Sequence, residues 1–283
     1  MPPRSSPTAR QRRLGAELRK LRERAGMTAS QAGALLGADQ ARVSNMESGR
    51  VGISADRLRT LAGHYACADE QLVEALVAMV GDRTRHWWEE YRTLLPAGQL
   101  DLAELEHHAT SLRTAQTATL PGLLQTVEHA RVVFGQGIPS LRPPEVEHRI
   151  SYRVKRQDVL FRDDPVPYTA IIHEAALRMR FGGRDITRRQ LEHILTMSER
   201  PGVTVLVLPF AAGEFPGSGQ TLCYATGPVQ ALDTIQLDQS HGVVFHDAES
   251  KLQRYRQLLR RLEELALDPA GSRDLIRLVA REL

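Results

Sequence analysis

The sequence is poor in cysteine and has no long apolar run. Its 283 residues include two cysteines, Cys67 and Cys223, which are too few for a disulfide scaffold and too far apart for a zinc site. Hydrophobic residues make up 42% of the chain, yet no stretch approaches the roughly 18 consecutive apolar residues of a membrane helix. Residues 1–30 are basic and polar and lack the apolar segment of a signal peptide. We therefore expect a cytoplasmic, reduced protein that has no membrane partner.

The sequence also lacks the motifs of common enzyme classes. It contains no P-loop, no His-Glu-x-x-His, no Gly-x-Ser-x-Gly and no His-x-Lys. The adjacent His107 and His108 point to different faces of a helix, so they do not form a metal site with Glu104. We therefore expect no catalytic activity, no metal ion and no cofactor.

The excess of positive charge lies at the N-terminal end. The whole chain has 37 Lys and Arg against 34 Asp and Glu. Residues 1–82 hold 12 of the basic and 9 of the acidic residues, so the remainder is balanced. Residues 1–24 hold eight basic residues against Glu17 and Glu23. A basic end on an otherwise neutral protein indicates a polyanionic partner for that end alone.

Apolar spacing and capping signals predict five short helices in the first eighty residues. Between Thr8 and Arg24, one helical stripe is formed by Leu14, Leu18 and Leu21. The later helices begin at capping residues, and several of the five end at glycines. The capping residues are Thr28 (in a capping box with Gln31), Asp39, Ser54 and Asp69, and the glycines are Gly26, Gly37 and Gly49. The tight turn between the second and third helices predicts a helix-turn-helix DNA-binding module.

Residues 27–50 resemble the lambda-repressor-like (XRE) family of helix-turn-helix proteins. Their sequence is MTASQAGALLGADQARVSNMESGR. The positions in register with the family signature are Thr28, Gln31, Ala32, Leu35, Gly37, Val43, Ser44, Glu47 and Gly49. The resemblance implies an all-α, five-helix DNA-binding domain with double-stranded DNA as its partner.

The helix that follows Asp39 is predicted to be the recognition helix, whose side chains contact base edges in the major groove. Val43 and Met46 belong to its buried side. The candidates for base contact are therefore Gln40, Ala41, Ser44 and Asn45. Gln and Asn pair bidentately with adenine, and Ala contacts a thymine methyl group. We assign Arg42 and Arg50 to phosphates, and Gln31 stands where this family usually binds a phosphate.

Beyond Gly81 the pattern changes, and we divide the chain into domains 1–81 and 82–283. The tryptophan-rich segment RHWWEEYRTLLP is predicted to form an amphipathic helix. Residues 101–117 are predicted to form another, because Leu102, Leu105, Ala109 and Leu112 share one stripe. Two more helices are expected, from Pro121 to Phe134 and over residues 144–160.

From Tyr168 onward the periodicity becomes strand-like. Strands are predicted at 168–174, 204–210, 221–226 and 231–238, with a short strand or edge in HGVVFHD. Helices are predicted at 174–180, 187–199, 248–266 and 269–282. Together these elements predict an α+β domain with a helical collar, a small central sheet of four or five strands and two C-terminal helices.

This second half looks like the uncharacterised C-terminal domain of actinobacterial regulators of the WhiJ-type and antitoxin-like group. The similar stretches include WWEEYRTLLP, PGLLQT, HEAALR and ERPGVTVLVLPF. The segment ALDTIQLD departs from the family, because it lacks the Tyr-x-Glu common in the corresponding strand. The resemblance implies transcription control, often beside a gene for a small partner protein.

The role of the second domain stays open between two hypotheses. In the first, the second domain has a small-molecule pocket lined by Trp87, Trp88, Tyr91 and the 211–220 loop. The other interpretation of these aromatic residues is that they only hold the domains together. Alternatively, the domain is a platform for a small partner protein, which exposed apolar area on the last two helices would support. The sequence thus predicts a sequence-specific, homodimeric transcriptional regulator whose C-terminal domain binds an effector or partner. The alternative is an antitoxin-like protein that neutralises a small partner and binds DNA for autoregulation.

Overall fold

The structure is a computed structural model, and it describes residues 7–80, 86–217, 219–239 and 242–283. The main division between its two compact units falls between His86 and Trp87. The boundary predicted between residues 81 and 82 touches residues outside the described ranges and stays a prediction. Each unit is described by itself below.

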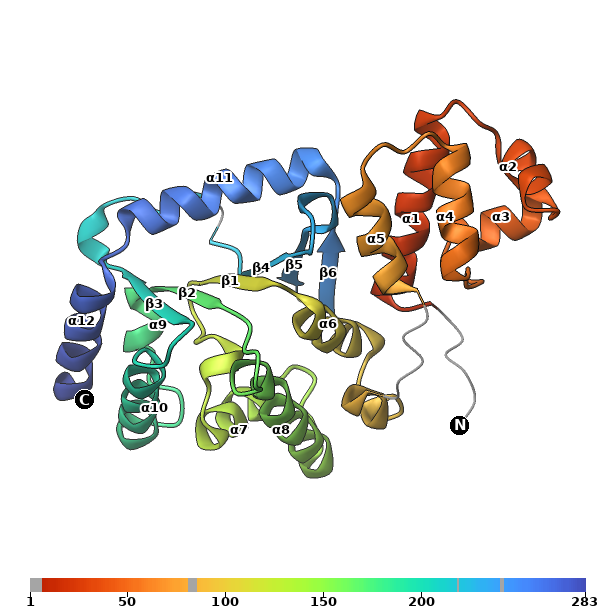
Figure 1. The fold of residues 1–283 in the computed structure, drawn as a ribbon. Coiled ribbons are helices and arrows are strands. Elements are labelled where there is room, and N and C mark those ends of the chain that lie inside the picture. The colour runs from red at the N-terminus through yellow and green to blue at the C-terminus, as the bar shows by residue number, and fades with distance from the viewer. Residues whose placement is uncertain (1–6, 81–85, 218, 240–241) are drawn as a thin grey trace. The chain divides into compact units, whose positions relative to one another are not determined.

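The first unit is an all-helical bundle, as the sequence predicts (Figure 1). Its helices are α1 (Ala9–Arg24), α2 (Ala29–Leu35), α3 (Gln40–Glu47), α4 (Ala55–His64) and α5 (Glu70–Met79). Every helix begins at a capping side chain whose oxygen accepts a backbone N–H of the first turn. Thr28, Asp39, Ser54 and Asp69 are the predicted caps, and the structure adds Thr8 as the cap of α1. The core is made of leucines from α1, α4 and α5, among them Leu18, Leu58 and Leu76.

The second unit is a mixed six-stranded sheet with helices on both faces (Figure 1). Its strands are β1 (Ser111–Gln116), β2 (Tyr168–His173), β3 (Val203–Leu208), β4 (Leu222–Thr226), β5 (Thr234–Gln239) and β6 (Gly242–His246). The order is β3-β2-β1-β4-β5-β6. The first three strands are parallel, and β4, β5 and β6 continue as an antiparallel meander from the other side of β1. The four main predicted strands and the short HGVVFHD strand are all present.

The predicted helix over residues 101–117 is wrong in its second half. Helix α6 (Ala97–His108) ends where Ala109 becomes extended, and the next residues form β1. The helical spacing of the leucines continues as far as Leu112, but Leu112 belongs to β1. Its side chain is buried in the core that packs against the sheet, not on the face of a helix. β1 is held by β2 on one side, where Leu112 pairs with Tyr168, and by β4 on the other. Pairing with strands far along the chain therefore overrides the local helical pattern.

The remaining helices follow the sequence prediction with two corrections. The tryptophan segment forms only a short 3-10 helix, Trp87–Tyr91, and the helix expected from Pro121 is a 3-10 turn, Gly122–Leu124, followed by a separate α7. Thr126 separates the two because its side chain caps α7. The other helices are α7 (Val127–Gly135), α8 (Pro143–Gln157), α9 (Glu174–Arg178), α10 (Arg184–Met197), α11 (Glu249–Leu265) and α12 (Pro269–Glu282).

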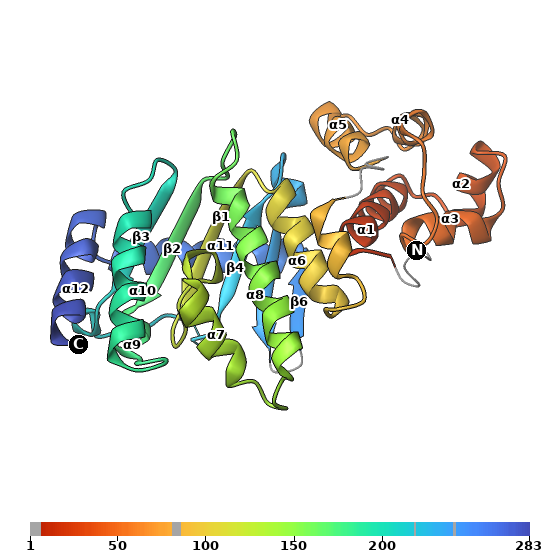
Figure 2. The same ribbon diagram turned by 90° about the horizontal axis from the view of Figure 1, so that it is seen from below.

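The two faces of the sheet are covered differently. Helices α6, α7, α8 and α10 lie over one face, and α11 crosses the other (Figure 2). Alternate strand residues point to opposite faces, so Ile171 and Ile235 pack toward α11, whereas Ile172 packs with α10 and α12. We call the face toward α6–α8 and α10 the helix-side face.

Among the described residues, none of the helices is long and apolar enough to span a bilayer.

A buried histidine lies on α7 beneath the helix-side layer. His129 is fully buried and its ring contacts Phe181 edge-on. Within the described ranges, neither ring nitrogen has a hydrogen-bond partner. Burial, together with the charge of Arg153, lowers the pKa of His129 to about 4. The neutral ring is therefore the form that the fold accepts.

Acid should destabilise the second unit through His129. The unfolded chain binds this proton near pH 6.5 and the folded chain only near pH 4, so its stability is complete above pH 6.5 and falls as the pH drops toward 4. We expect a loss of about 2 kcal/mol in the free energy of unfolding between pH 7 and pH 5. Urea unfolding followed by the fluorescence of Trp87 and Trp88 would measure it. His129→Leu should flatten this slope, whereas His148→Gln should leave it; equal slopes in all three proteins would contradict the assignment.

Candidate nucleic-acid interface

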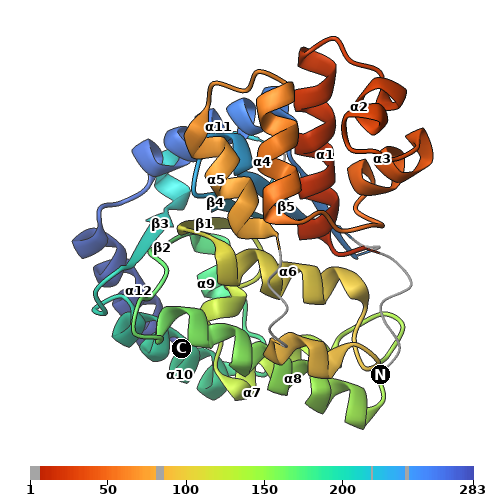
Figure 3. The same cartoon turned by 45° about the vertical axis from the view of Figure 1, so that its right-hand side comes forward.

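The turn between α2 and α3 is tight because two glycines permit it. Gly37 has a positive φ of 61°, which L side chains rarely adopt. Gly33 lies so close to the turn that a Cβ atom there would stand 2.7 Å from the carbonyl oxygen of Ala38. Asp39 then caps α3 by accepting the backbone N–H of Arg42. The sequence thus sets the angle between the two helices through local contacts (Figure 3).

The far end of α3 is held against α1 by close backbone packing. A Cβ atom on Gly15 would stand 2.6 Å from the carbonyl oxygen of Met46, so only glycine fits there. Gly49, with a φ of 74°, approaches the carbonyl oxygen of Gln11 in the same way. These contacts fix α3 in place without using its outer face.

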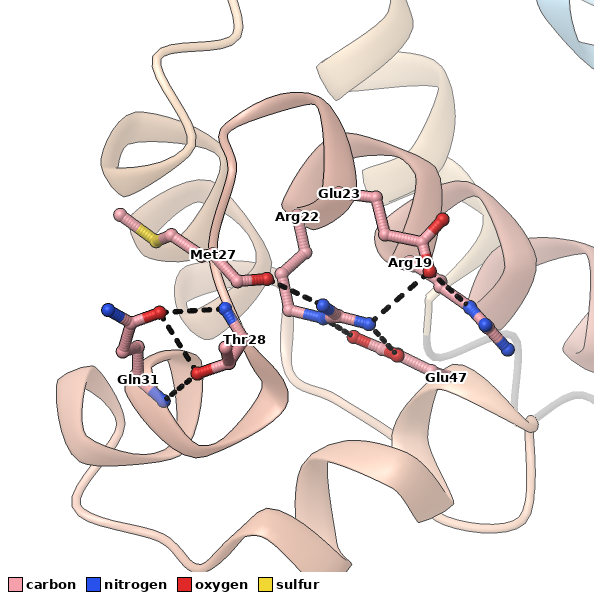
Figure 4. A network of polar contacts seen from close by, with 7 residues as sticks. All are labelled: Arg19, Arg22, Glu23, Met27, Thr28, Gln31 and Glu47. Atoms are coloured by element: carbon pink, nitrogen blue, oxygen red, sulfur yellow. Dashed lines mark hydrogen bonds and ion pairs between the residues drawn. The ribbon is translucent and has the colours of Figure 1, made fainter.

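A buried ion pair joins α1 to the end of α3 (Figure 4). The guanidinium of Arg22 donates to both carboxylate oxygens of Glu47, at 2.5 and 2.9 Å, and to the carbonyl oxygen of Met27 at 2.6 Å. The two side chains are only 10% and 9% exposed. The hydrogen bond to Glu47 holds the pKa of Arg22 above its usual value even though burial opposes this. By sequence Arg22 belongs to the basic N-terminal end, and only the fold shows this structural role.

Other basic residues of α1 are also engaged within the unit. Arg19 pairs with Glu23 at 2.7 Å, and Lys20 pairs with Glu17 at 2.7 Å. The charge excess of residues 1–24 is thus partly neutralised in the fold. Net charge is therefore weaker evidence for a polyanionic partner than the exposed residues of α3.

The outer face of α3 carries the residues that the sequence predicts for base contact. Val43 and Met46 are 2% and 5% exposed and anchor the helix. The residues Gln40, Ala41, Arg42 and Ser44 are exposed, and Asn45 is half-buried. Arg50, beyond the end of α3, is exposed as well.

Gln31 lies exposed in the first turn of α2. Its Oε1 accepts the backbone N–H of Thr28 at 2.8 Å and the Thr28 hydroxyl at 2.9 Å. The carboxamide nitrogen points away from Thr28 (Figure 4). The capping box therefore orients a donor outward, as a phosphate contact requires.

A basic residue that the sequence analysis missed lies beside α3. A shallow hollow of about 530 Å³ is lined by Ala41, Arg42, Asn45 and the exposed Arg57, among others. Arg57 is in the first turn of α4, after the Ser54 cap. An arginine beside a helix N-terminus is a signal for phosphate binding, because both favour an anion.

The aromatic residues predicted for the second unit form a packed cluster. Trp88 and Tyr91 are 2% and 6% exposed and pack with Leu100 and Tyr152. Trp87 contacts Trp88 edge-on, with ring centroids 5.6 Å apart. Trp88 and Tyr91 therefore contribute to packing inside this unit rather than to an open surface.

No group of three or more metal-ligating side chains that could hold an ion occurs in the part of the chain that the structure describes.

Two family models match the chain. One, described as a helix-turn-helix domain, matches residues 13–76. The other, a domain of unknown function (DUF5753), matches residues 99–278. No curated protein and no solved structure matches the chain.

Breaking the buried ion pair should destabilise the first unit. Glu47→Ala leaves the Arg22 guanidinium buried without its carboxylate, and we expect a loss of about 3–5 kcal/mol in the free energy of unfolding. The double variant Arg22→Met/Glu47→Leu should lose less than the sum of the single changes, since it leaves no orphaned charge. Because both tryptophans lie in the second unit, circular dichroism at 222 nm is the measurement. Arg19→Met, in an exposed pair, is the control and should change little; an equal loss there would refute this role of the buried pair.

Proposed function

Because the chain belongs to the DUF5753 family and carries an N-terminal helix-turn-helix domain, we propose that it is a sequence-specific transcriptional regulator of double-stranded DNA. The helix-turn-helix domain indicates DNA binding. The observation that supports sequence specificity is the division of α3, whose Val43 and Met46 are buried while Gln40, Ala41 and Ser44 are exposed together. In this proposal the protein acts in the cytoplasm, is a member of the XRE group and catalyses no reaction.

In this proposal the base contacts come from α3, and the phosphate contacts come from α3 and the segments beside it. Gln40 and Asn45 present side-chain amides, which suit adenine in the major groove, and Ala41 suits a thymine methyl group. Arg42, Arg50 and Arg57 bind phosphates and set the register of the helix on the duplex. The outward amide of Gln31 adds a phosphate contact from α2.

The proposal includes a homodimer. One small module seldom supplies enough specific affinity, and a two-fold protein binds half-sites about one helical turn apart. The expected operator is therefore a palindrome.

The second unit acts as the sensor in this proposal, binding an effector or a partner protein. An antitoxin-like role would be favoured by exposed apolar area on the last two helices. Among their described residues, however, Leu252, Leu259, Ile276 and Val279 are buried, and Leu278 is the one large apolar side chain that is strongly exposed. This burial supports the effector hypothesis over the partner platform.

Substitutions on α3 should separate base contacts from phosphate contacts. We expect Asn45→Ala or Gln40→Ala to weaken binding of the operator by about 1–3 kcal/mol and to leave binding of scrambled DNA unchanged. Arg50→Ala and Arg57→Ala should weaken both and reduce the salt slope by about one each. Fluorescence anisotropy against the protein's own promoter region and a scrambled duplex, across a salt series, measures both quantities. Equal losses of Asn45→Ala on the two duplexes would refute the recognition-helix assignment.

A further inference from the structure

The helix-side face of the sheet is polar in one half. Over β2 and β3 this face is apolar, with Ala170, Ile172 and Val205 packed in the main core. Over β1 and β5 the corresponding positions are Thr114, Gln116 and Gln236, which are 7%, 8% and 3% exposed. Buried polar side chains at core-facing strand positions cost free energy unless they have partners. These three have partners in Tyr168, Thr221 and Asp238, so this half of the face is a hydrogen-bonded polar layer rather than an apolar one.

A cavity lies over that polar half. It has a volume of about 280 Å³ and lies between the sheet and helices α6, α7 and α8. Polar groups line it from both sides: Glu106, Arg153 and Arg156 from the helices, and Gln116, Gln236 and Asp238 from the strands. The volume is at the lower end of the range for small-molecule sites.

One of the two arginines in the cavity is fully paired. Arg156 donates to both carboxylate oxygens of Glu106, at 2.8 and 2.5 Å. Although burial opposes the charged form, the Glu106 carboxylate holds the pKa of Arg156 above its usual value. This pair is a structural element that needs no ligand.

The other arginine has no carboxylate. Among the described residues, no carboxylate forms an ion pair with Arg153, and its NH1 donates to the side-chain oxygen of Gln125 at 2.6 Å. Its buried Nε has no acceptor, and its guanidinium lies over the Phe134 ring, 4.8 Å from the centroid. Gly122 leaves room for this guanidinium, since a Cβ atom there would stand 2.8 Å from NH1 and the end of the side chain would have to shift. The fold therefore keeps an uncompensated cation at the wall of a polar cavity, where a planar carboxylate matches its donors.

The strand side of the cavity carries the complementary group. Asp238 accepts a hydrogen bond from Gln236 at 2.7 Å, and none of the described cationic residues forms an ion pair with it. Asp238 is exposed at the strand edge of the cavity, so a ligand with an anion at Arg153 and a hydrogen-bond donor at Asp238 would contact both walls.

We propose that this cavity binds a small organic acid, with its carboxylate at Arg153 and a hydroxyl or ammonium group at Asp238. Leu120, Leu123 and Phe134 contact its apolar part. This deepens the proposed sensor role, on which it rests, by naming the class of effector and the residues that select it. A carboxylate fits better than a dianionic phosphate, because one guanidinium is unpaired and Glu106 and Asp238 line the same space.

The test is thermal unfolding of the full-length protein, followed by the fluorescence of Trp87 and Trp88 in the second unit. The probes are 4-hydroxyphenylacetate, L-phenylalanine and 4-aminobutyrate, each paired with its own carboxamide. We expect at least one carboxylate to raise the melting temperature by about 3 °C or more at saturation, and its carboxamide to have no such effect. The proposal is overturned if none of the carboxylates raises it or if the carboxamides act equally.

Three variants locate the binding. Arg153→Met removes the charge and should abolish the shift. Gly122→Ala retains the charge but makes the end of the Arg153 side chain move, and it should reduce the shift. Arg149→Met, on α8 outside the cavity lining, should keep it. Without ligand, Arg153→Met should melt at or above the wild-type temperature, because it removes an unpaired buried charge. A shift that persists in Arg153→Met overturns the proposal. The melting assay contains no DNA, so its result is independent of operator binding. If the protein binds the acid but no operator DNA, the regulator function is refuted and the acid site stands.

Discussion

Each arginine that this chain buries needs an acceptor, because a guanidinium group does not lose its proton in a protein. In the first unit this constraint joins Arg22 to Glu47 and so ties α3 to α1. In the second unit it joins Arg156 to Glu106 and holds α8 beside α6. Arg153 is the exception, with a carboxamide partner and no carboxylate. The two paired arginines connect helices within their units, and Arg153 lacks the carboxylate that the proposed ligand would supply.

The central strand β1 connects the parallel half of the sheet to its antiparallel half. Its parallel neighbour β2 is reached through α7 and α8, and its antiparallel neighbour β4 begins the meander. The helical crossovers cover one face (Figure 2), as successive right-handed connections in the same direction require. Because Thr114 and Gln116 alternate with Ala115 along β1, the strand contributes polar groups to the cavity and an apolar contact to the α11 side. One strand thus faces the cavity on one side and the helix α11 on the other.

The sequence was most informative where structure depends on neighbours a few residues apart. Caps such as Thr28 and Asp39, and the burial of Val43 and Met46, follow from contacts within one or two turns, and all of them are confirmed. The prediction failed at β1, because the leucine stripe from Leu102 to Leu112 is equally compatible with a helix until β2 and β4 pair with it. Arg57 was missed for a similar reason. Only the packing of α4 brings it to the hollow that Asn45 lines.

By itself the sequence determined the helix-turn-helix domain and the exposed face of its recognition helix, since capping and 3.6-residue periodicity are local properties. It also determined most strands through their alternation. The tertiary structure alone decided which arginines are paired, where β1 lies and which polar residues of distant strands meet in one cavity. Those outcomes depend on contacts between residues up to about a hundred positions apart, such as Arg153 beside Gly122 and Thr114 opposite Cys223. Spacing along the chain carries no information about such pairs, because they form only when the chain is folded.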